Sequence, residues 1–278
     1  MSGTAWPASP ASAAGLSPES YAWVRRFLLE RTGIELKDGK QALVTTRLDR
    51  RVRHHGLAGY DEYVALLAAR ALPGEEQVAI DLLTTNETSF FREAGHFELL
   101  RTLARSHDAG RPLRVWSAAS STGEEAYTIA LVLADELGEA PWEVVATDVS
   151  SRCVEATRRG LYAVDAAQRI PEDLRRRFCL RGREEHEGLF TVESRWRARV
   201  RAQQANLTAD LPDLGRFDVA FLRNVMIYFS PATKQDVVAR VAGLVRPGGH
   251  LVVGQAESLA GIPHALQSVA PSVYRIPG

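Results

Sequence analysis

The feature that most constrains the fold is an apolar run that ends abruptly in polar residues. Residues 217–222 (FDVAFL) have the composition of a buried strand in a parallel sheet, and Arg223, Asn224 and Tyr228 follow them. In open α/β sheets the ligand crevice lies outside the carboxyl ends of the parallel strands. We therefore predict an α/β fold in which residues 223–229 form the floor of a small-molecule site.

In two further segments a predicted strand also ends in small or polar residues. The apolar run 113–119 breaks into the small-residue stretch 120–123 and then into a helical pattern, which predicts a strand, a tight turn and a helix. Small residues let a backbone approach a ligand closely, and free N–H groups at a helix start favour an anion. The next predicted strand, 143–148, ends in Asp148, at a spacing that suits a carboxylate binding ribose hydroxyls.

Each of these features also has a purely structural interpretation. The turn lacks the G-x-G-x-x-G pattern, and Thr122 with Glu125 matches a helix capping box. Asp148 also suits the N-cap of a helix that starts near Ser151. Downstream, residues 244–254 predict a helix end, a turn at Pro247–Gly249 and another buried strand. The three strand ends favour a ligand site only in combination.

Composition limits the classes of protein that remain. A chain of 278 residues with 45% hydrophobic content can bury one large core and a small satellite domain. The formal net charge is zero, so the chain as a whole is not steered toward nucleic acid. The two cysteines, Cys153 and Cys179, have no metal or redox spacing, which favours a reduced, cytoplasmic setting and predicts no metal.

No segment predicts membrane insertion or secretion. No apolar run is long enough to span a bilayer. The first 20 residues contain no Lys or Arg and no apolar h-region, so they do not resemble a secretory signal. We expect residues 1–17 to be a disordered tail, because they are rich in Ala, Ser, Pro and Gly.

Residues 18–83 predict a small all-α domain, since their apolar residues recur at helical spacing. Within it the segment 40–55 is strongly basic: Arg47, Arg50, Arg51 and His54 share one helix face, and Arg53 adds to the charge. Asp49 is the acid at helical spacing there. The charge indicates either a solvated face or a docking surface. Aromatic residues do not interleave the arginines, which argues against nucleic acid.

The remainder, 84–278, predicts the large α/β domain with one irregular insertion. Residues 174–201 are rich in Arg and short apolar runs, and Glu187–Gly188 predicts a hairpin turn before the strand-like segment 189–192. We expect a small antiparallel β-subdomain at about 174–201.

Three long motifs together resemble a known family. They are residues 84–93 (TTNETSFFRE), 116–125 (WSAASSTGEE) and 223–229 (RNVMIYF), and they resemble the chemotaxis receptor methyltransferases of the CheR type. The resemblance extends from about Tyr21 to about Ile276. It implies a Rossmann-like methyltransferase domain with a mostly parallel seven-stranded sheet, preceded by an all-α domain. It also implies S-adenosyl-L-methionine (SAM) as cofactor and S-adenosyl-L-homocysteine as product.

The resemblance further implies the partner and the site residues. The partner is the cytoplasmic helical domain of a chemoreceptor, docked on the basic helix through Arg47, Arg50, Arg51 and Arg53, and we expect a monomer. Arg92 and Tyr228 are the predicted catalytic residues. The predicted cofactor contacts come from Asn86, Thr88, Arg92, Glu125, Asp148, Asn206, Leu207, Arg223 and Asn224.

Structural alternatives stand beside these roles. Asn206 also suits a turn, and Tyr228 a core position. Arg92 also suits an ion pair with Glu93 or Glu98. Arg92 is otherwise expected to hold a carboxylate, either that of the acceptor or that of SAM, because a guanidinium binds a carboxylate bidentately.

The predicted function is therefore methyl transfer from SAM to receptor glutamates in sensory adaptation. Two alternatives remain. One is a methyltransferase that acts on another acceptor, such as a nucleic acid or a small acid. The other is a regulatory or scaffold protein that binds SAM without turnover.

Overall fold

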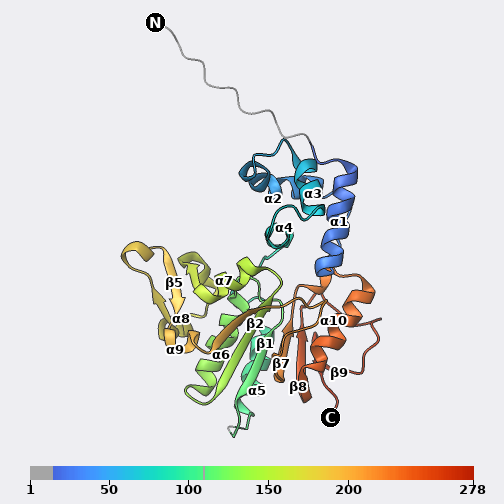
Figure 1. Ribbon diagram of the computed structural model, residues 1–278. Helices are drawn as coiled ribbons and strands as arrows, with labels where there is room; N and C mark the ends of the chain where they lie inside the picture. Colours follow the sequence, from blue (N-terminus) through green and yellow to red (C-terminus); the bar gives the residue numbers. More distant parts are fainter. Residues whose placement is uncertain (1–14, 109) are drawn as a thin grey trace. The chain divides into compact units, whose positions relative to one another are not determined.

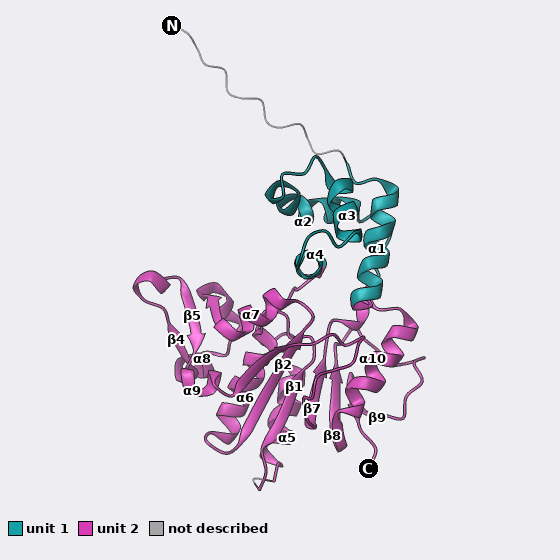
Figure 2. Ribbon diagram, viewed as in Figure 1, with its two compact units in different colours: residues 1–31, 35–83 teal, residues 32–34, 84–278 magenta. Residues whose placement is uncertain are grey.

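The computed structural model describes residues 15–108 and 110–278, which form two compact units. One unit contains residues up to Arg31 together with Glu35–Leu83, and the other contains Thr32–Ile34 with Thr84–Gly278 (Figure 2). Most of the tail predicted at 1–17 lies outside the described residues. No helix among the described residues is long and apolar enough to cross a membrane.

The first unit is helical, as predicted. Its core consists of apolar side chains at helical spacing, such as Val44, Leu48 and Val52, which are all buried. Tyr63 is also fully buried and carries a hydroxyl, so it needs a polar partner inside the unit. The helices are α1 (Pro18–Thr32), α2 (Gln41–His54), α3 (Tyr60–Ala68) and α4 (Glu75–Leu83).

The second unit is built on a seven-stranded sheet with the strand order β6-β2-β1-β7-β8-β10-β9 (Figure 1). Strands β6, β2, β1, β7 and β8 are parallel, and β10 runs antiparallel to both β8 and β9. The strands are β1 (Leu113–Ser117), β2 (Trp142–Asp148), β6 (Val200–Gln204), β7 (Phe217–Leu222), β8 (Val245–Val253), β9 (Gln267–Ala270) and β10 (Val273–Arg275). This confirms the predicted mostly parallel sheet.

Helices cover both faces of this sheet. Successive strand residues point to opposite sides, so apolar side chains on each face are buried under helices. Val144 packs into the core that includes side chains of α5 and α6, whereas its neighbour Val145 packs into the core that includes side chains of α10. Ser150 caps α7 by accepting a bond from the Cys153 amide, and Ser230 caps α10 in the same way. The helices are α5 (Gly95–Arg105), α6 (Glu124–Leu137), α7 (Ser151–Arg159) and α10 (Pro231–Gly243).

The predicted turn at Pro247–Gly249 is wrong, because strand β8 already begins at Val245. The pairing of β8 with β7 shifts register between Phe217 and Val219, which places the Pro-Gly-Gly segment within the strand. Gly249 is needed for this close approach, since an added Cβ would lie 2.6 Å from the Asp218 carbonyl oxygen.

A separate three-stranded antiparallel sheet confirms the β-subdomain, with the order β3-β5-β4. Strands β4 (Cys179–Arg181) and β5 (Leu189–Val192) form the expected hairpin, and Gly188 in its turn has φ +81°. The third strand, β3 (Leu161–Ala163), lies before residue 174, where the insertion was expected to start. The short helices around it are η1 (Val164–Arg169), α8 (Glu172–Phe178), η2 (Glu184–His186) and α9 (Ser194–Arg197).

Candidate cofactor site

A pocket lies at the carboxyl ends of the parallel strands in the second unit. It has about 870 Å³ of empty space, including space open to solvent. The pocket brings together all the residues that the sequence predicted for cofactor binding and catalysis. These are Asn86, Thr88, Arg92, Glu125, Asp148, Asn206, Leu207, Arg223, Asn224 and Tyr228.

The turn between β1 and α6 forms one wall. Ser121 and Gly123 both have positive φ, and a Cβ at Gly123 would lie 2.7 Å from the Tyr162 hydroxyl oxygen. The capping box does not form, because Thr122 bonds Glu124 instead of bonding with Glu125. Glu125 Oε1 accepts a hydrogen bond from the Ser117 hydroxyl at 2.7 Å, so this carboxylate lies against the strand end.

Asp148 ends β2 and ties two loops together. Its Oδ2 accepts from the Ser121 amide at 2.8 Å and its Oδ1 accepts from the Ser150 amide at 2.9 Å. The alternative of an N-cap role is excluded, because Ser150 caps α7. Asp148 is largely buried and lines the pocket, so its carboxylate is fixed in place before a ligand arrives.

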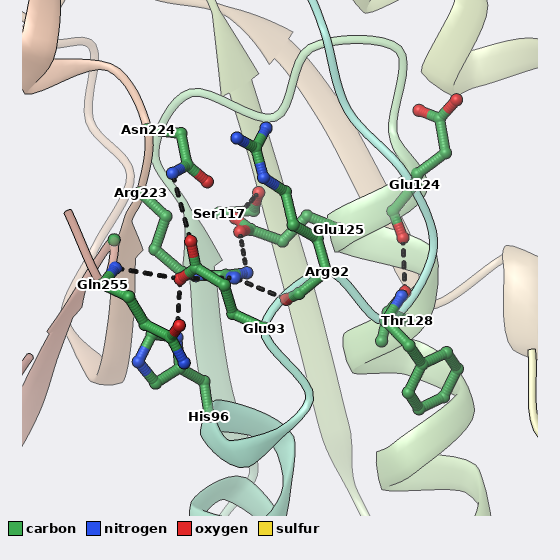
Figure 3. A network of polar contacts seen from close by, with 12 residues as sticks. Arg92, Glu93, His96, Ser117, Glu124, Glu125, Thr128, Arg223, Asn224 and Gln255 are labelled. Atoms are coloured by element: carbon green, nitrogen blue, oxygen red, sulfur yellow. Dashed lines mark hydrogen bonds and ion pairs between the residues drawn. The ribbon is translucent and has the colours of Figure 1, made fainter. Parts of the chain in front are cut away.

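Arg223 lines the pocket and joins two carboxylates (Figure 3). Its side chain is 1% exposed; Nη1 donates to Glu125 Oε2 at 2.8 Å and Nη2 donates to Glu93 Oε2 at 3.1 Å. Glu93 also accepts from the Gln255 amide and from Asn224 Nδ2. Burial alone would raise the pKa of Glu93, but these hydrogen bonds and the Arg223 charge hold it below its usual value. The network therefore links four chain segments around one buried cation.

His96 lies beside this network and does not line the pocket. Its Nδ1 lies 3.5 Å from Glu93 Oε2. Burial, and then the Arg223 charge, lower the pKa of His96 below its usual value. The imidazole is therefore neutral near neutral pH.

Arg92 and Tyr228 also line the pocket. Arg92 donates from Nη1 to the Glu87 carbonyl at 3.1 Å. The proposed ion-pair partners are engaged elsewhere: Glu93 pairs with Arg223, and Glu98 with Arg101. Tyr228 is half-buried at the end of the short helix η3 (Met226–Tyr228), so it is not a fully buried core residue.

Asn206 shows that a structural role and a pocket position coexist. Its Oδ1 accepts from the Thr208 amide at 3.0 Å, which is the turn geometry expected of Asn, while the residue also lines the pocket. Thr32 and Ile34 line the pocket as well, although no motif or spacing pointed to them. Ile34 reaches the site because its backbone forms a bridge with Phe229, far away in sequence.

In the helical unit, the arginines of α2 fall into two groups. Arg51 donates from Nη2 and Nε to Glu75 at 2.6 and 2.7 Å, and Arg47 donates to the Leu83 carbonyl, so both hold the unit together. Arg50 and Arg53 are exposed, and Arg53 pairs with Asp49 on the surface. The arginines of α2 are thus divided between two that bind groups within the unit, Arg47 and Arg51, and two that are exposed to solvent, Arg50 and Arg53.

Comparison with known proteins relates this site to a family. The family model described as CheR methyltransferase, SAM binding domain, matches residues 86–274, and the one described as CheR methyltransferase, all-alpha domain, matches residues 19–84. The chain belongs to the CheR methyltransferase family. The resemblance inferred from the three motifs is therefore confirmed, and with it the SAM cofactor.

Two relatives of this CheR family member illustrate how far the similarity extends. Chemotaxis protein methyltransferase 2 of Pseudomonas aeruginosa is 40% identical over 260 residues, which cover 92% of this chain and 92% of that protein. The chemotaxis protein methyltransferase of Escherichia coli is 39% identical over 264 residues, covering 94% of this chain and 92% of that protein.

The pocket residues fit SAM chemically. The cofactor carries an adenosine, a cationic sulfonium and an amino-acid end. Asp148 and Glu125 are acceptors for hydroxyl or ammonium donors, Arg92 suits a carboxylate, and Leu207 offers an apolar surface for a base. Among the charged residues of the lining, the carboxylates of Glu87, Glu125 and Asp148 outnumber the guanidinium groups of Arg92 and Arg223, which suits a cationic ligand.

Proposed function

We propose that this methyltransferase transfers the methyl group of SAM to glutamate side chains on the cytoplasmic helical domain of chemoreceptors. The methyl esters formed would serve sensory adaptation. The observation that carries this proposal is the similarity, over more than nine-tenths of the chain, to chemotaxis protein methyltransferases.

The cofactor contacts are assigned to the residues that the resemblance implied, all of which line the pocket. Asp148 accepts hydrogen bonds from the ribose hydroxyls, since a carboxylate can accept further bonds beside those from Ser121 and Ser150. Asn206 and Leu207, which follow strand β6 and line the pocket, are assigned to the adenine of the cofactor. Asn86, Thr88, Glu125 and Asn224 line the remaining wall, and Arg223 holds Glu125 in position.

The reaction requires alignment more than acid–base chemistry. SAM supplies an electrophilic methyl group when it is bound. The pKa of a solvent-exposed glutamate side chain is about 4.3, so it is already an ionised nucleophile near neutral pH. Fixing the geometry of attack can remove roughly 7 to 11 kcal/mol from a barrier. A general base is not needed, which agrees with the position of the neutral His96 outside the pocket lining.

Arg92 and Tyr228 are assigned to the reacting end of the site. The Arg92 guanidinium holds a carboxylate, either that of the acceptor or that of SAM. Holding the acceptor too tightly would slow the reaction, because the nucleophile loses its charge in the transition state. The Tyr228 hydroxyl orients the reacting groups from the turn that follows β7.

Receptor docking is assigned to the exposed arginines of α2. Arg50 and Arg53 carry charge into solvent, where it can attract an acidic receptor helix. Arg47 and Arg51 are assigned to the support of this helix, because their guanidinium groups bind within the unit.

An acceptor panel tests the function. The chain is incubated with methyl-labelled SAM and, separately, a receptor cytoplasmic fragment, a nucleic acid and small carboxylic acids. We expect label on the receptor fragment alone, in a linkage that mild base hydrolyses. Label on another acceptor would show a different methyltransferase, and SAM binding without transfer to any of them would favour a regulatory role.

A further inference from the structure

Glu257 is a buried carboxylate that lies outside the cofactor pocket. It is 5% exposed and does not line the pocket. Its Oε2 accepts from the Asn224 amide at 2.6 Å and from the Gly254 amide at 3.0 Å. Its Oε1 accepts from the Ile227 amide at 3.1 Å. One side chain thus binds two amides of the turn that carries Tyr228 and one amide just after strand β8.

The backbone conformation of residues 224–227 explains why an anion stabilises this turn. Asn224 has φ +57°, which is uncommon for a residue other than glycine. The amides of the turn converge on one point, in the manner of the concave backbone sites that bind anions. Buried N–H groups without a partner are costly, so a carboxylate supplied by the chain itself stabilises this conformation.

The contact also explains why Gly254 is a glycine. Its φ is not positive, so backbone freedom is not the reason. An added Cβ would lie 2.7 Å from Glu257 Oε2, 2.8 Å from Asn224 Nδ2 and 3.1 Å from the Asn224 amide nitrogen. A methyl group at this position would therefore push Glu257 away from the turn.

We propose that Glu257 is a positioning residue for methyl transfer: it binds the backbone of residues 224–227 and so fixes Tyr228 at the edge of the cofactor pocket. The inference rests on the proposed role of Tyr228 in the reaction. Asn224 is affected less, because its side chain is also held by Glu93. Loss of the Glu257 contact should therefore impair the chemical step more than cofactor binding.

The first test is Glu257→Gln, with Glu172→Gln on the exposed surface of α8 as the matched control. The amide group replaces one acceptor oxygen by a donor that faces N–H groups. We expect the single-turnover rate with a receptor fragment to fall about ten- to a hundredfold, as for a small displacement of reacting groups. SAM affinity should change by less than about threefold. An unchanged rate, or equal losses in rate and affinity, would overturn the proposal.

The second test perturbs the same contact without removing the charge. Gly254→Ala should lower the rate, and it should also lower SAM affinity because the added Cβ would lie 2.8 Å from Asn224 Nδ2, whereas Gly243→Ala, where nothing lies near the added Cβ, should change neither. A wild-type rate in Gly254→Ala would contradict the proposal even if Glu257→Gln failed to fold.

Hydrogen exchange of the Asn224 and Ile227 amides separates this inference from the proposed function. In Glu257→Gln and Gly254→Ala these amides should exchange about tenfold faster than in the wild type, while amides of α10 stay unchanged. This readout needs no acceptor. If the wild-type protein methylates nothing, the proposed function fails, whereas unchanged exchange at Asn224 and Ile227 refutes the role of Glu257 itself.

Discussion

Asp148 is the residue on which cofactor affinity should depend most clearly. Asp148→Ala removes a charged acceptor from the ribose hydroxyls. Hydrogen bonds to charged groups contribute about 1.5–3 kcal/mol, so we expect SAM affinity to fall roughly ten- to a hundredfold. Calorimetry on the folded variant measures this directly. Asp210→Ala, at an exposed position, is the control, and unchanged affinity in Asp148→Ala would refute the assignment.

Single residues also show where sequence reasoning is limited. Asp148 and Arg223 were found because the first ends an apolar strand and the second directly follows one, and parallel strands end at a common edge. The bonding pattern of Arg223 was not predictable, since its partners Glu93 and Glu125 come from distant segments. Glu257 was missed entirely, because a carboxylate that binds backbone amides leaves no spacing pattern in the sequence.

At the scale of elements, helix α2 should separate receptor docking from cofactor binding. The double charge reversal Arg50→Glu with Arg53→Glu is expected to weaken receptor methylation, most strongly at low ionic strength, and to leave SAM affinity intact. Methylation assays over a salt series measure the effect, and Arg176→Glu on the exposed surface of α8 is the control. Full methylation at every salt concentration would show that this face is only solvated.

The stability of the helical unit should depend on pH through the Glu75 carboxylate. Burial would raise the pKa of Glu75, but hydrogen bonds from Arg51, Tyr63 and His55 lower it from 4.5 to about 2. Because the folded pKa lies below the unfolded one, the ionised carboxylate stabilises the unit above pH 4.5, and this stability is lost as the pH falls toward 2.

Hydrogen exchange of α2–α4 tests this dependence. Glu75→Gln should exchange faster than the wild type near neutral pH, and the difference should close as the pH approaches 2. Peptides from α6, in the other unit, provide the internal reference. Equal exchange of both proteins at neutral pH would contradict a stabilising role for Glu75.

Elements were predicted well where their pattern is local. The helices of residues 18–83 and the parallel strands follow from periodicity and apolar runs. The ion pair of Arg51 could not be predicted, because its partner Glu75 lies on α4 and becomes a neighbour only through tertiary packing. Strand β3 was left out of the β-subdomain for the same reason, since its pairing with β5 joins segments well separated in the chain.

At the scale of the whole molecule, the methyltransferase unit supplies a pocket that suits SAM, and the helical unit supplies exposed cationic residues. The proposed function uses both features: the pocket would bind the cofactor, and the cationic surface would bind the receptor that carries the acceptor glutamate. The charges of the chain cancel overall, so the proposed docking of a receptor would depend on a local charged surface rather than on net charge.

Methylation of receptor glutamates is measured most directly by labelling a receptor cytoplasmic fragment and locating the label by peptide mapping. A matched fragment, in which the glutamates of the methylated region are replaced by glutamine, serves as the control. We predict label on glutamate side chains of the first fragment, released by mild base, and none on the second. Equal labelling of both fragments, or a base-stable product, would contradict glutamyl ester formation.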